Sequence, residues 1–173
     1  MEQLRGIKLK RFKKGLKRPE LDIVIILENL QYARNVAEIF RIADALKVSE
    51  IILTGISKSP PFGKDLQKVS RAKEKSVKWQ KSDITGKTIN IYLKKGYEIL
   101  ALELTDTAIS VFDYNLPRNK KIVLLVGNEV YGITKDSLKK VDKVIYIPIF
   151  GKGASLNVSV ASGVCLYLLI IKK

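Results

Sequence analysis

The stretch Gly151-Lys-Gly-Ala-Ser-Leu-Asn-Val-Ser159 sets a glycine loop directly before an apolar helix. A run typical of a β-strand, residues 143–149, precedes this loop, and the apolar stretch continues to residue 171. Two interpretations are open. Ser155 or Asn157 can be the N-cap of a buried helix. Alternatively, the loop and the helix start can form a small-molecule site built largely from backbone N–H and C=O groups.

Apolar runs and helical patterns alternate along the rest of the chain. Continuous apolar runs, as expected of strands buried on both faces, lie at residues 22–27, 50–53, 97–104, 121–126 and 143–149. Helical spacing is found at residues 33–47, 87–95 and 134–141 and in the final apolar segment, with Gly96 as the C′ residue of the second of these helices. Residues 57–63 suggest a loop and 64–81 a basic connection, in which we expect Trp79 to be partly buried rather than exposed for stacking on a ligand. This alternation predicts an α/β fold with a mostly parallel sheet and helices on both faces. Such sheets bind ligands beyond the carboxyl ends of their strands.

The charge of the chain is strongly positive. Its 173 residues include 32 Lys and Arg against 17 Asp and Glu, a formal net charge of +15. This excess suits a polyanionic partner, because each phosphate contact releases counterions. Lys and Arg are concentrated in residues 1–20, so we expect a flexible basic arm there and a single domain over residues 21–173. A membrane is not expected, because the apolar stretch 156–171 is too short to span one and no signal peptide is evident.

Histidine is absent, and cysteine occurs once, at Cys165. The missing imidazole removes the usual general base and the commonest transition-metal ligand, so no metal site is expected. Cys165 lies in an apolar helix and is expected to be an inert core residue. With no internal disulfide possible, we expect a cytoplasmic protein. Nothing matches a P-loop or a strand followed by G-x-G-x-x-G.

Two more segments place polar residues after buried strands. Residues 29–35 lead into a helix on which Arg34, Glu38 and Arg41 share one face. For any one of these charged residues, a solvated, salt-bridged face is the favoured interpretation. The segment Val126-Gly-Asn-Glu-Val-Tyr-Gly132 sets a carboxylate between two glycines, for which the alternative is a tight turn with a helix-capping acid. Three such loops at one sheet edge favour a shared site over three separate caps.

Together these segments resemble the three motifs of the SpoU/TrmH RNA ribose methyltransferases, which belong to the SPOUT superfamily. The matching residues are Asn35, Arg41 and Ala43; Gly127, Asn128, Glu129 and Gly132; and Ile147, Pro148, Ser155, Leu156, Asn157 and Ser159. The resemblance covers nearly the whole chain after the basic arm. It implies a sheet whose C-terminal part is threaded as a trefoil knot, S-adenosylmethionine as cofactor, and a homodimer with the active site at the subunit interface.

The resemblance also implies roles for single residues. Arg41 matches the catalytic arginine of the family, and Asn35, Glu129 and Asn157 match its other polar active-site positions. The implied cofactor-binding residues are Leu104, Thr105, Gly127, Asn128, Ile147, Ser155 and Leu156. Ala154 departs from the family, which often has an acidic or bulky polar residue there.

The resemblance therefore implies methyl transfer from S-adenosylmethionine to a ribose 2′-OH of tRNA or rRNA. Methylation of an RNA base and a non-catalytic knotted RNA-binding module are the alternatives. Arginine is a poor base, because its pKa exceeds about 12. We expect Arg41 to hold the adjacent phosphate bidentately and so to lower the cost of alkoxide character on the 2′-oxygen. Glu129 is expected to orient Arg41 or Asn35.

Overall fold

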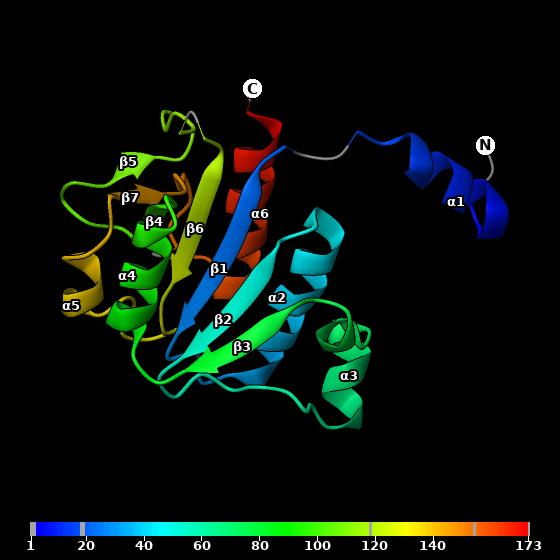
Figure 1. The fold of residues 1–173 in the computed structure, drawn as a ribbon, viewed down its shortest axis with the longest axis horizontal. Helices are drawn as coiled ribbons and strands as arrows, with labels where there is room; N and C mark the ends of the chain where they lie inside the picture. Colours follow the sequence, from blue (N-terminus) through cyan, green and yellow to red (C-terminus); the bar gives the residue numbers. More distant parts are fainter. Residues whose placement is uncertain (1–2, 18–19, 118, 154, 173) are drawn as a thin grey trace.

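A computed structural model of the chain describes residues 3–17, 20–117, 119–153 and 155–172, and these residues form one seven-stranded sheet. Its strands are β1 (Asp22–Glu28), β2 (Glu50–Thr54), β3 (Trp79–Ser82), β4 (Glu98–Leu102), β5 (Ile109–Ser110), β6 (Lys121–Val126) and β7 (Lys143–Tyr146). They lie in the order β3-β2-β1-β6-β4-β7-β5, and every strand pair is parallel (Figure 1). The predicted parallel α/β sheet is confirmed.

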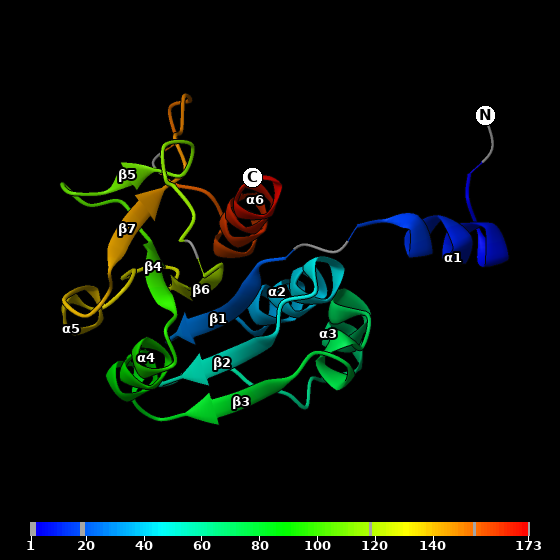
Figure 2. The ribbon, with the colours of Figure 1, turned by 45° about the horizontal axis from the view of Figure 1, so that its top comes forward.

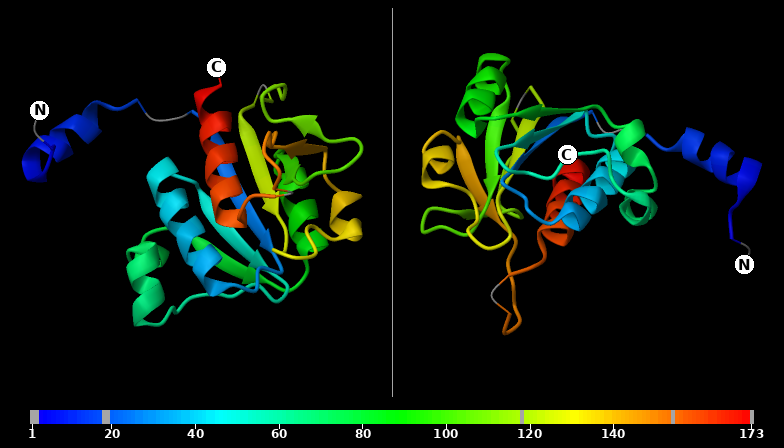
Figure 3. Two further views of the ribbon diagram at one scale, coloured as in Figure 1. Left: turned by 180° about the vertical axis from the view of Figure 1, so that it is seen from behind. Right: turned by 90° about the horizontal axis from the view of Figure 1, so that it is seen from below.

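Helices cover both faces of this sheet. They are α2 (Ala33–Leu46), α3 (Lys64–Ser70), α4 (Thr85–Lys94), α5 (Lys135–Leu138) and α6 (Val158–Ile171), with a 3-10 turn η1 (Lys73–Lys75). A further helix, α1 (Gly6–Gly15), buries none of its residues and covers neither face. Figures 2 and 3 show α2, α3 and α6 on one face and α4 and α5 on the other. The central strand β1 serves both cores, because Ile25 and Leu27 pack into one and Val24 and Ile26 into the other. This two-sided burial accounts for the uninterrupted apolar run of the strand.

The helix ends follow the local sequence. Helix α2 buries Val36, Ile39 and Phe40 on its apolar face and ends where Lys47 adopts a φ of 55°. Gly96 follows α4 with a φ of 78°, a conformation that costs glycine little, and the predicted C′ role is confirmed.

The structure corrects the prediction for residues 64–81. They are not an irregular connection but contain α3, η1 and most of β3. The segment is held to the body by Trp79, whose ring meets Phe40 edge to face at 6.4 Å between centroids. Trp79 is partly buried, as predicted. The high lysine content of the segment hid its short helix, because lysines on the solvent side interrupt the apolar pattern.

The structure also differs at the N terminus and at two strand ends. Residues 6–15 form helix α1, where the sequence suggested a flexible segment, and none of them is buried. The predicted strand 143–149 ends at Tyr146, close to Pro148, which has no N–H to donate to a neighbouring strand. The predicted strand 97–104 ends at Leu102, and the Leu104 N–H is bound by the carboxylate of Glu103 instead.

Other predictions concern the C-terminal helix and the threading of the chain. Cys165 is fully buried, and this burial raises the pKa of its thiol to about 12, which confirms it as an unreactive core residue. Within the described ranges, no helix has the length and apolar character needed to cross a bilayer. The trefoil knot and the division into an arm and a domain stay predictions.

Candidate active site at the carboxyl ends of the strands

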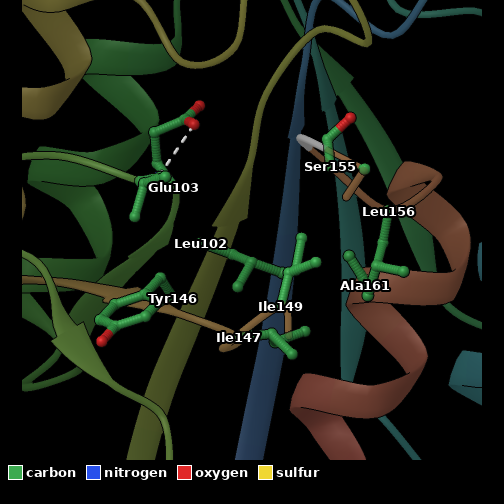
Figure 4. Close-up of a pocket in the computed structure, with 10 residues that line it drawn as sticks. Leu102, Glu103, Tyr146, Ile147, Ile149, Ser155, Leu156 and Ala161 are labelled. Carbon is green, nitrogen blue, oxygen red and sulfur yellow. Dashed lines mark hydrogen bonds between the residues drawn. The ribbon is translucent and has the colours of Figure 1, made fainter. Parts of the chain in front are cut away.

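Two adjoining cavities open where β4, β6 and β7 end. The first, here called the apolar cavity, has a volume of 390 Å³. It is lined by Leu102, Glu103, Leu104, Tyr146, Ile147, Ile149, Gly153, Ser155, Leu156 and Ala161. Figure 4 shows Glu103 and Tyr146 on one side of it and Ser155, Leu156 and Ala161 on the other. Its walls are mainly aliphatic, and the Glu103 carboxylate and the Ser155 hydroxyl add polar groups to them.

The second cavity, here called the polar cavity, has a volume of 470 Å³ and shares five residues with the first. The shared residues are Leu102, Glu103, Ser155, Leu156 and Ala161. Its remaining walls come from the start of α2, the loop after β6 and the start of α6, including Asn35, Gly127, Asn128, Glu129 and Asn157. All three loops that the sequence singled out therefore meet at one place.

The loop after β6 is a tight turn, as one interpretation of the sequence proposed. Asn128 and Gly132 exchange two backbone hydrogen bonds of 3.0 Å, and the Asn128 side-chain oxygen accepts from the N–H groups of Val130 and Tyr131. Gly127 has no room for a side chain, because an added Cβ would lie 2.3 Å from the carbonyl carbon of Gly132. The turn presents Glu129 toward α2.

Glu129 joins this turn to the start of α2. Its carboxylate accepts the N–H groups of Gln31 and Tyr32 at 3.2 Å each, and the Asn35 Nδ2 at 2.9 Å. A carboxylate at a helix N-terminus is favoured by the unpaired N–H groups there. Glu129 thus binds the segment that leads into α2 and is a partner of Asn35, and its role in a shared site stays a prediction.

Asn157 extends the same hydrogen-bond chain into α6. Its Oδ1 accepts the N–H of Ser159 at 2.9 Å and that of Val160 at 3.4 Å, so it is the N-cap of the helix. Its Nδ2 donates to Asn35 Oδ1 at 3.1 Å. The backbone N–H groups of Ser159 and Val160 fix the Oδ1 of Asn157, and the Glu129 carboxylate fixes the Nδ2 of Asn35. The orientation of both side-chain amides is therefore determined. We call Glu129, Asn35 and Asn157 the polar chain.

The chain of contacts continues to Glu38, which the sequence did not single out as a site residue. Its carboxylate accepts the hydroxyl of Ser159 and, at 3.1 Å, the Arg34 Nε. The alternative of a salt-bridged face on this helix is therefore confirmed for Arg34 and Glu38. Glu38 nevertheless also ties α2 to α6. Its i+3 spacing from Asn35 places it on the same side of α2, but nothing in the sequence signals the contact with Ser159.

Arg41 lies apart from the polar chain. It is exposed on α2, six residues after Asn35, which is about 9 Å along the helix axis. It lines neither cavity, and no described residue forms a hydrogen bond or ion pair with it.

Thr105 also lines neither cavity, and Ala154 falls outside the described residues. Of the implied cofactor-binding residues, Leu104 and Ile147 line the apolar cavity, and Gly127 and Asn128 line the polar one.

The carboxylates near this edge of the sheet serve as helix caps and anchors. Among the residues that the structure describes, no group of three or more Cys, Asp or Glu side chains is placed to hold a metal ion. Glu28, fully buried at the end of β1, accepts the Thr134 N–H and the hydroxyls of Thr134 and Ser137. It therefore anchors the start of α5 rather than facing a cavity.

Asn157 can be tested as a cap and as a member of the polar chain separately. We expect Asn157→Asp to keep the cap, because Asp and Asn are equal N-caps, and to lose about 1 kcal/mol with the hydrogen bond to Asn35, whereas Asn157→Ala loses both interactions, about 2 kcal/mol. Both changes remove the Nδ2 group that donates to Asn35. We expect turnover to fall about tenfold, because a tenfold change corresponds to roughly 1.4 kcal/mol, about the contribution of one hydrogen bond. Urea unfolding and turnover measured on the same samples check this. Full turnover of Asn157→Asp would mean that Asn157 is a cap only.

Comparison with known proteins places the chain among RNA-methylating enzymes by sequence similarity. The model of the SpoU rRNA methylase family matches residues 22–167. The chain is 30% identical to the tRNA (guanosine(18)-2′-O)-methyltransferase of Aquifex aeolicus, over 92% of the chain and 74% of that protein. It is 34% identical to the Escherichia coli K12 protein of the same name, over 88% of the chain and 64% of that protein.

Solved structures share the fold. The crystal structure of the Aquifex aeolicus TrmH/SpoU tRNA modifying enzyme has a TM-score of 0.78 at 28% identity, over 94% of this chain and 80% of that one. The AdoMet-bound rRNA methyltransferase of Sinorhizobium meliloti also has a TM-score of 0.78, at 24% identity, over 88% of this chain and 57% of that one. With its three motif loops gathered around shared cavities and nearly all of its length matched, this chain belongs to the SpoU rRNA methylase family.

Proposed function

We propose that this protein is an S-adenosylmethionine-dependent RNA methyltransferase that modifies a ribose 2′-OH of tRNA or rRNA in the cytoplasm. The names of the relatives from Aquifex aeolicus and Escherichia coli support the ribose as the target. The single observation that carries the proposal is the polar chain Glu129–Asn35–Asn157, which lies beside an apolar cavity at the carboxyl edge of the sheet. The net charge of +15 supports a nucleic-acid substrate.

The apolar cavity suits the proposed cofactor. Its 390 Å³ lies within the roughly 300–1,000 Å³ of small-molecule sites. Aliphatic walls from Leu102, Ile147 and Leu156 match an adenine ring, and the Glu103 carboxylate and Ser155 hydroxyl match ribose hydroxyls. Gly153 in the wall leaves the backbone itself accessible, since nothing lies within 4 Å of where its Cβ would be. When bound there, S-adenosylmethionine would supply an electrophilic methyl group.

The residues of the chain would then orient the nucleophile. Methyl transfer to an alcohol depends on alignment, and fixed positioning can account for much of the rate. Asn35 and Asn157 are fixed by hydrogen bonds at both ends, so they can hold a ribose without rearranging. Glu129 already accepts three N–H groups, which suits it to orient Asn35 rather than to remove a proton. Arg41 would neutralise the neighbouring phosphate and favour alkoxide character on the 2′-oxygen.

We further propose that the protein is a homodimer with a shared active site. Helix α6 buries Cys165, Leu166 and Leu169 against its own chain, yet it leaves a second apolar stripe exposed. The stripe consists of Val160, Val164, Tyr167 and Ile171, which are 39–67% exposed and spaced at i, i+4, i+7 and i+11. A helix that is apolar on two sides needs a second partner. A second copy would also account for an Arg41 that lines neither cavity of its own chain.

Val164→Glu tests the shared site. Val164 is 39% exposed, so we expect the folded monomer to tolerate the charge, whereas a paired stripe would have to bury it. We expect a monomer by sedimentation velocity and loss of nearly all methyl transfer. Ile91→Glu, at a 51% exposed position on α4, is the matched control and should change neither. A fully active monomeric Val164→Glu protein would rule out a site shared between subunits.

The proposed reaction is tested by incubating the protein with methyl-labelled S-adenosylmethionine and total bacterial RNA, followed by nuclease digestion and mass analysis. Label in 2′-O-methylnucleosides is the expected result. Label in a base would establish base methylation instead. Cofactor binding in a calorimeter with no methyl transfer to any RNA would count against the proposal, and RNA binding without cofactor binding would indicate the non-catalytic module.

A further inference from the structure

A lysine-rich groove lies away from the two cavities described above. It has a volume of 740 Å³ and is formed by the basic side of α1, the residues that follow it, and the carboxyl end of α2. Its lining residues are Lys10, Lys13, Lys14, Leu16, Lys17, Asp44, Ala45, Leu46 and Lys47. Figure 2 shows α1 lying outside the helical layers, on the side of the molecule where α2 and α3 lie. We call this feature the lysine groove.

The lysines of the groove are gathered on one side by helical spacing. Lys10, Lys13 and Lys14 follow the pattern i, i+3 and i+4, which places them on one face of α1. Lys17 follows the end of the helix and lines the same groove. Lys47 faces them from the end of α2. Among the described residues, none of these five ammonium groups has an ion-pair partner. Like charges held together in this way repel one another unless an anion lies between them.

The one carboxylate in the groove does not neutralise these lysines. Asp44 is 2.8 Å from the Lys73 Nζ and accepts the hydroxyl of Ser76 at 3.3 Å, so its charge is directed to η1. The groove therefore keeps an excess of five positive charges. A polyanion that enters it would gain from each lysine at once, with release of counterions.

Helix α2 links the groove to the proposed active site, because Asn35 near its start lines the polar cavity and Asp44, Ala45 and Leu46 at its end line the groove. Arg41 and Ala45 are four residues apart and both exposed, so they lie on the same face of the helix. Ala45 is also a wall of the groove. From Asn35 to Leu46 the helix rises about 16 Å, with Arg41 between them. A strand that places a phosphate at Arg41 would reach the groove within a few nucleotides.

We propose that the lysine groove binds the phosphodiester backbone of the substrate RNA next to the modified nucleotide. This inference rests on the proposed function and adds where the RNA lies. A membrane surface fits the groove less well, because its lysines face α2 across a hollow that a flat bilayer cannot enter. An extended RNA strand can enter it. RNA held in this way is recognised through its backbone, so the groove contributes affinity and not sequence preference.

The test compares two double variants of the full-length protein. Lys13→Gln/Lys14→Gln removes two charges from the groove, and Lys87→Gln/Lys94→Gln removes two exposed charges from α4 on the opposite face of the sheet. Affinity for unfractionated bacterial tRNA is measured from about 0.05 to 0.3 M salt. We expect the groove variant to bind about tenfold more weakly near 0.1 M salt, with a salt slope lower by roughly 1.4, since each phosphate of a single strand contributes about 0.7. We expect the α4 variant to match the wild type.

Lys47→Gln tests the opposite wall, and we expect its salt slope to fall by roughly 0.7. Equal RNA affinity and salt slope for the groove and α4 variants would overturn the proposal. Loss of binding to phosphatidylcholine–phosphatidylserine vesicles with unchanged RNA affinity would overturn it in favour of a membrane. S-adenosylmethionine affinity, measured on each variant, reports on folding. If the wild type transfers no methyl group to RNA but the groove variant still loses tRNA affinity, the proposed function fails and the groove proposal stands.

Discussion

Arg41→Ala is expected to lower methyl transfer on the order of 10²-fold or more while leaving cofactor affinity unchanged. The magnitude follows from the loss of one positioned cationic donor at a site where negative charge develops. Cofactor affinity should persist because Arg41 lines neither the apolar nor the polar cavity of its chain. Single-turnover rates with labelled cofactor and saturating RNA, together with calorimetric titration of the cofactor, check both parts.

Arg41→Lys separates charge from geometry. Lysine keeps the positive charge but cannot bind a phosphate bidentately, so we expect a rate between those of Arg41→Ala and the wild type. Lys94→Ala, an exposed cation on the far side of the sheet, is the control and should turn over normally. An Arg41→Ala protein with undiminished turnover would show that the role proposed for this arginine is wrong.

Gly127→Ala adds one methyl group, and we expect it to destabilise the site more than any other single added methyl group would. The new Cβ would lie 2.3 Å from the carbonyl carbon of Gly132 and 2.4 Å from the Ile133 nitrogen, so backbone has to move. The opposing strand of the turn cannot yield easily, because Glu103 binds the Ile133 N–H at 3.1 Å. We expect a loss of about 3 kcal/mol in the free energy of unfolding, the upper end for overpacking. Displacing this turn moves a wall of the polar cavity. We therefore expect cofactor affinity to fall about tenfold, a loss of about 1.4 kcal/mol in binding free energy.

Gly151→Ala provides the matched comparison. Nothing lies within 4 Å of the position of its Cβ, and we expect a change within about 0.5 kcal/mol in either direction. Urea denaturation of both variants measures the free energy of unfolding, and calorimetric titration with S-adenosylmethionine measures cofactor affinity. Equal stabilities for the two variants would mean that the turn after β6 is more pliable than its hydrogen bonds indicate.

Most of the fold was predictable because its strands are buried on both faces. The runs at β1, β2 and β6 are apolar between their end residues, and short runs of this kind are typical of the central strands of a parallel sheet. The failures occurred where burial is one-sided or absent. Helix α3 presents lysines to solvent, α1 buries nothing, and β5 has two residues, so none of them has a clear apolar pattern.

The site was predictable as a set of loops but not as a set of contacts. Glycines and amides after buried strands marked the residues that come together, because parallel strands end at one edge. Which side chains pair is decided by tertiary geometry. The Asn35–Asn157 hydrogen bond, the Ser159–Glu38 contact and the isolation of Arg41 have no signature in spacing alone.

The hydrogen bonds of the polar chain can form only when the whole protein is folded. Its hydrogen bonds join positions 94 and 122 residues apart, so they enclose most of the molecule in two loops. Closing long loops is entropically costly, and such contacts tend to form late in folding. During synthesis α6 emerges after the other helices and strands described here, and until it docks, Asn35 lacks the Asn157 donor for its Oδ1. A nascent or truncated copy therefore has no partial version of this site, and amide exchange at Ser159 should follow global unfolding rather than local opening.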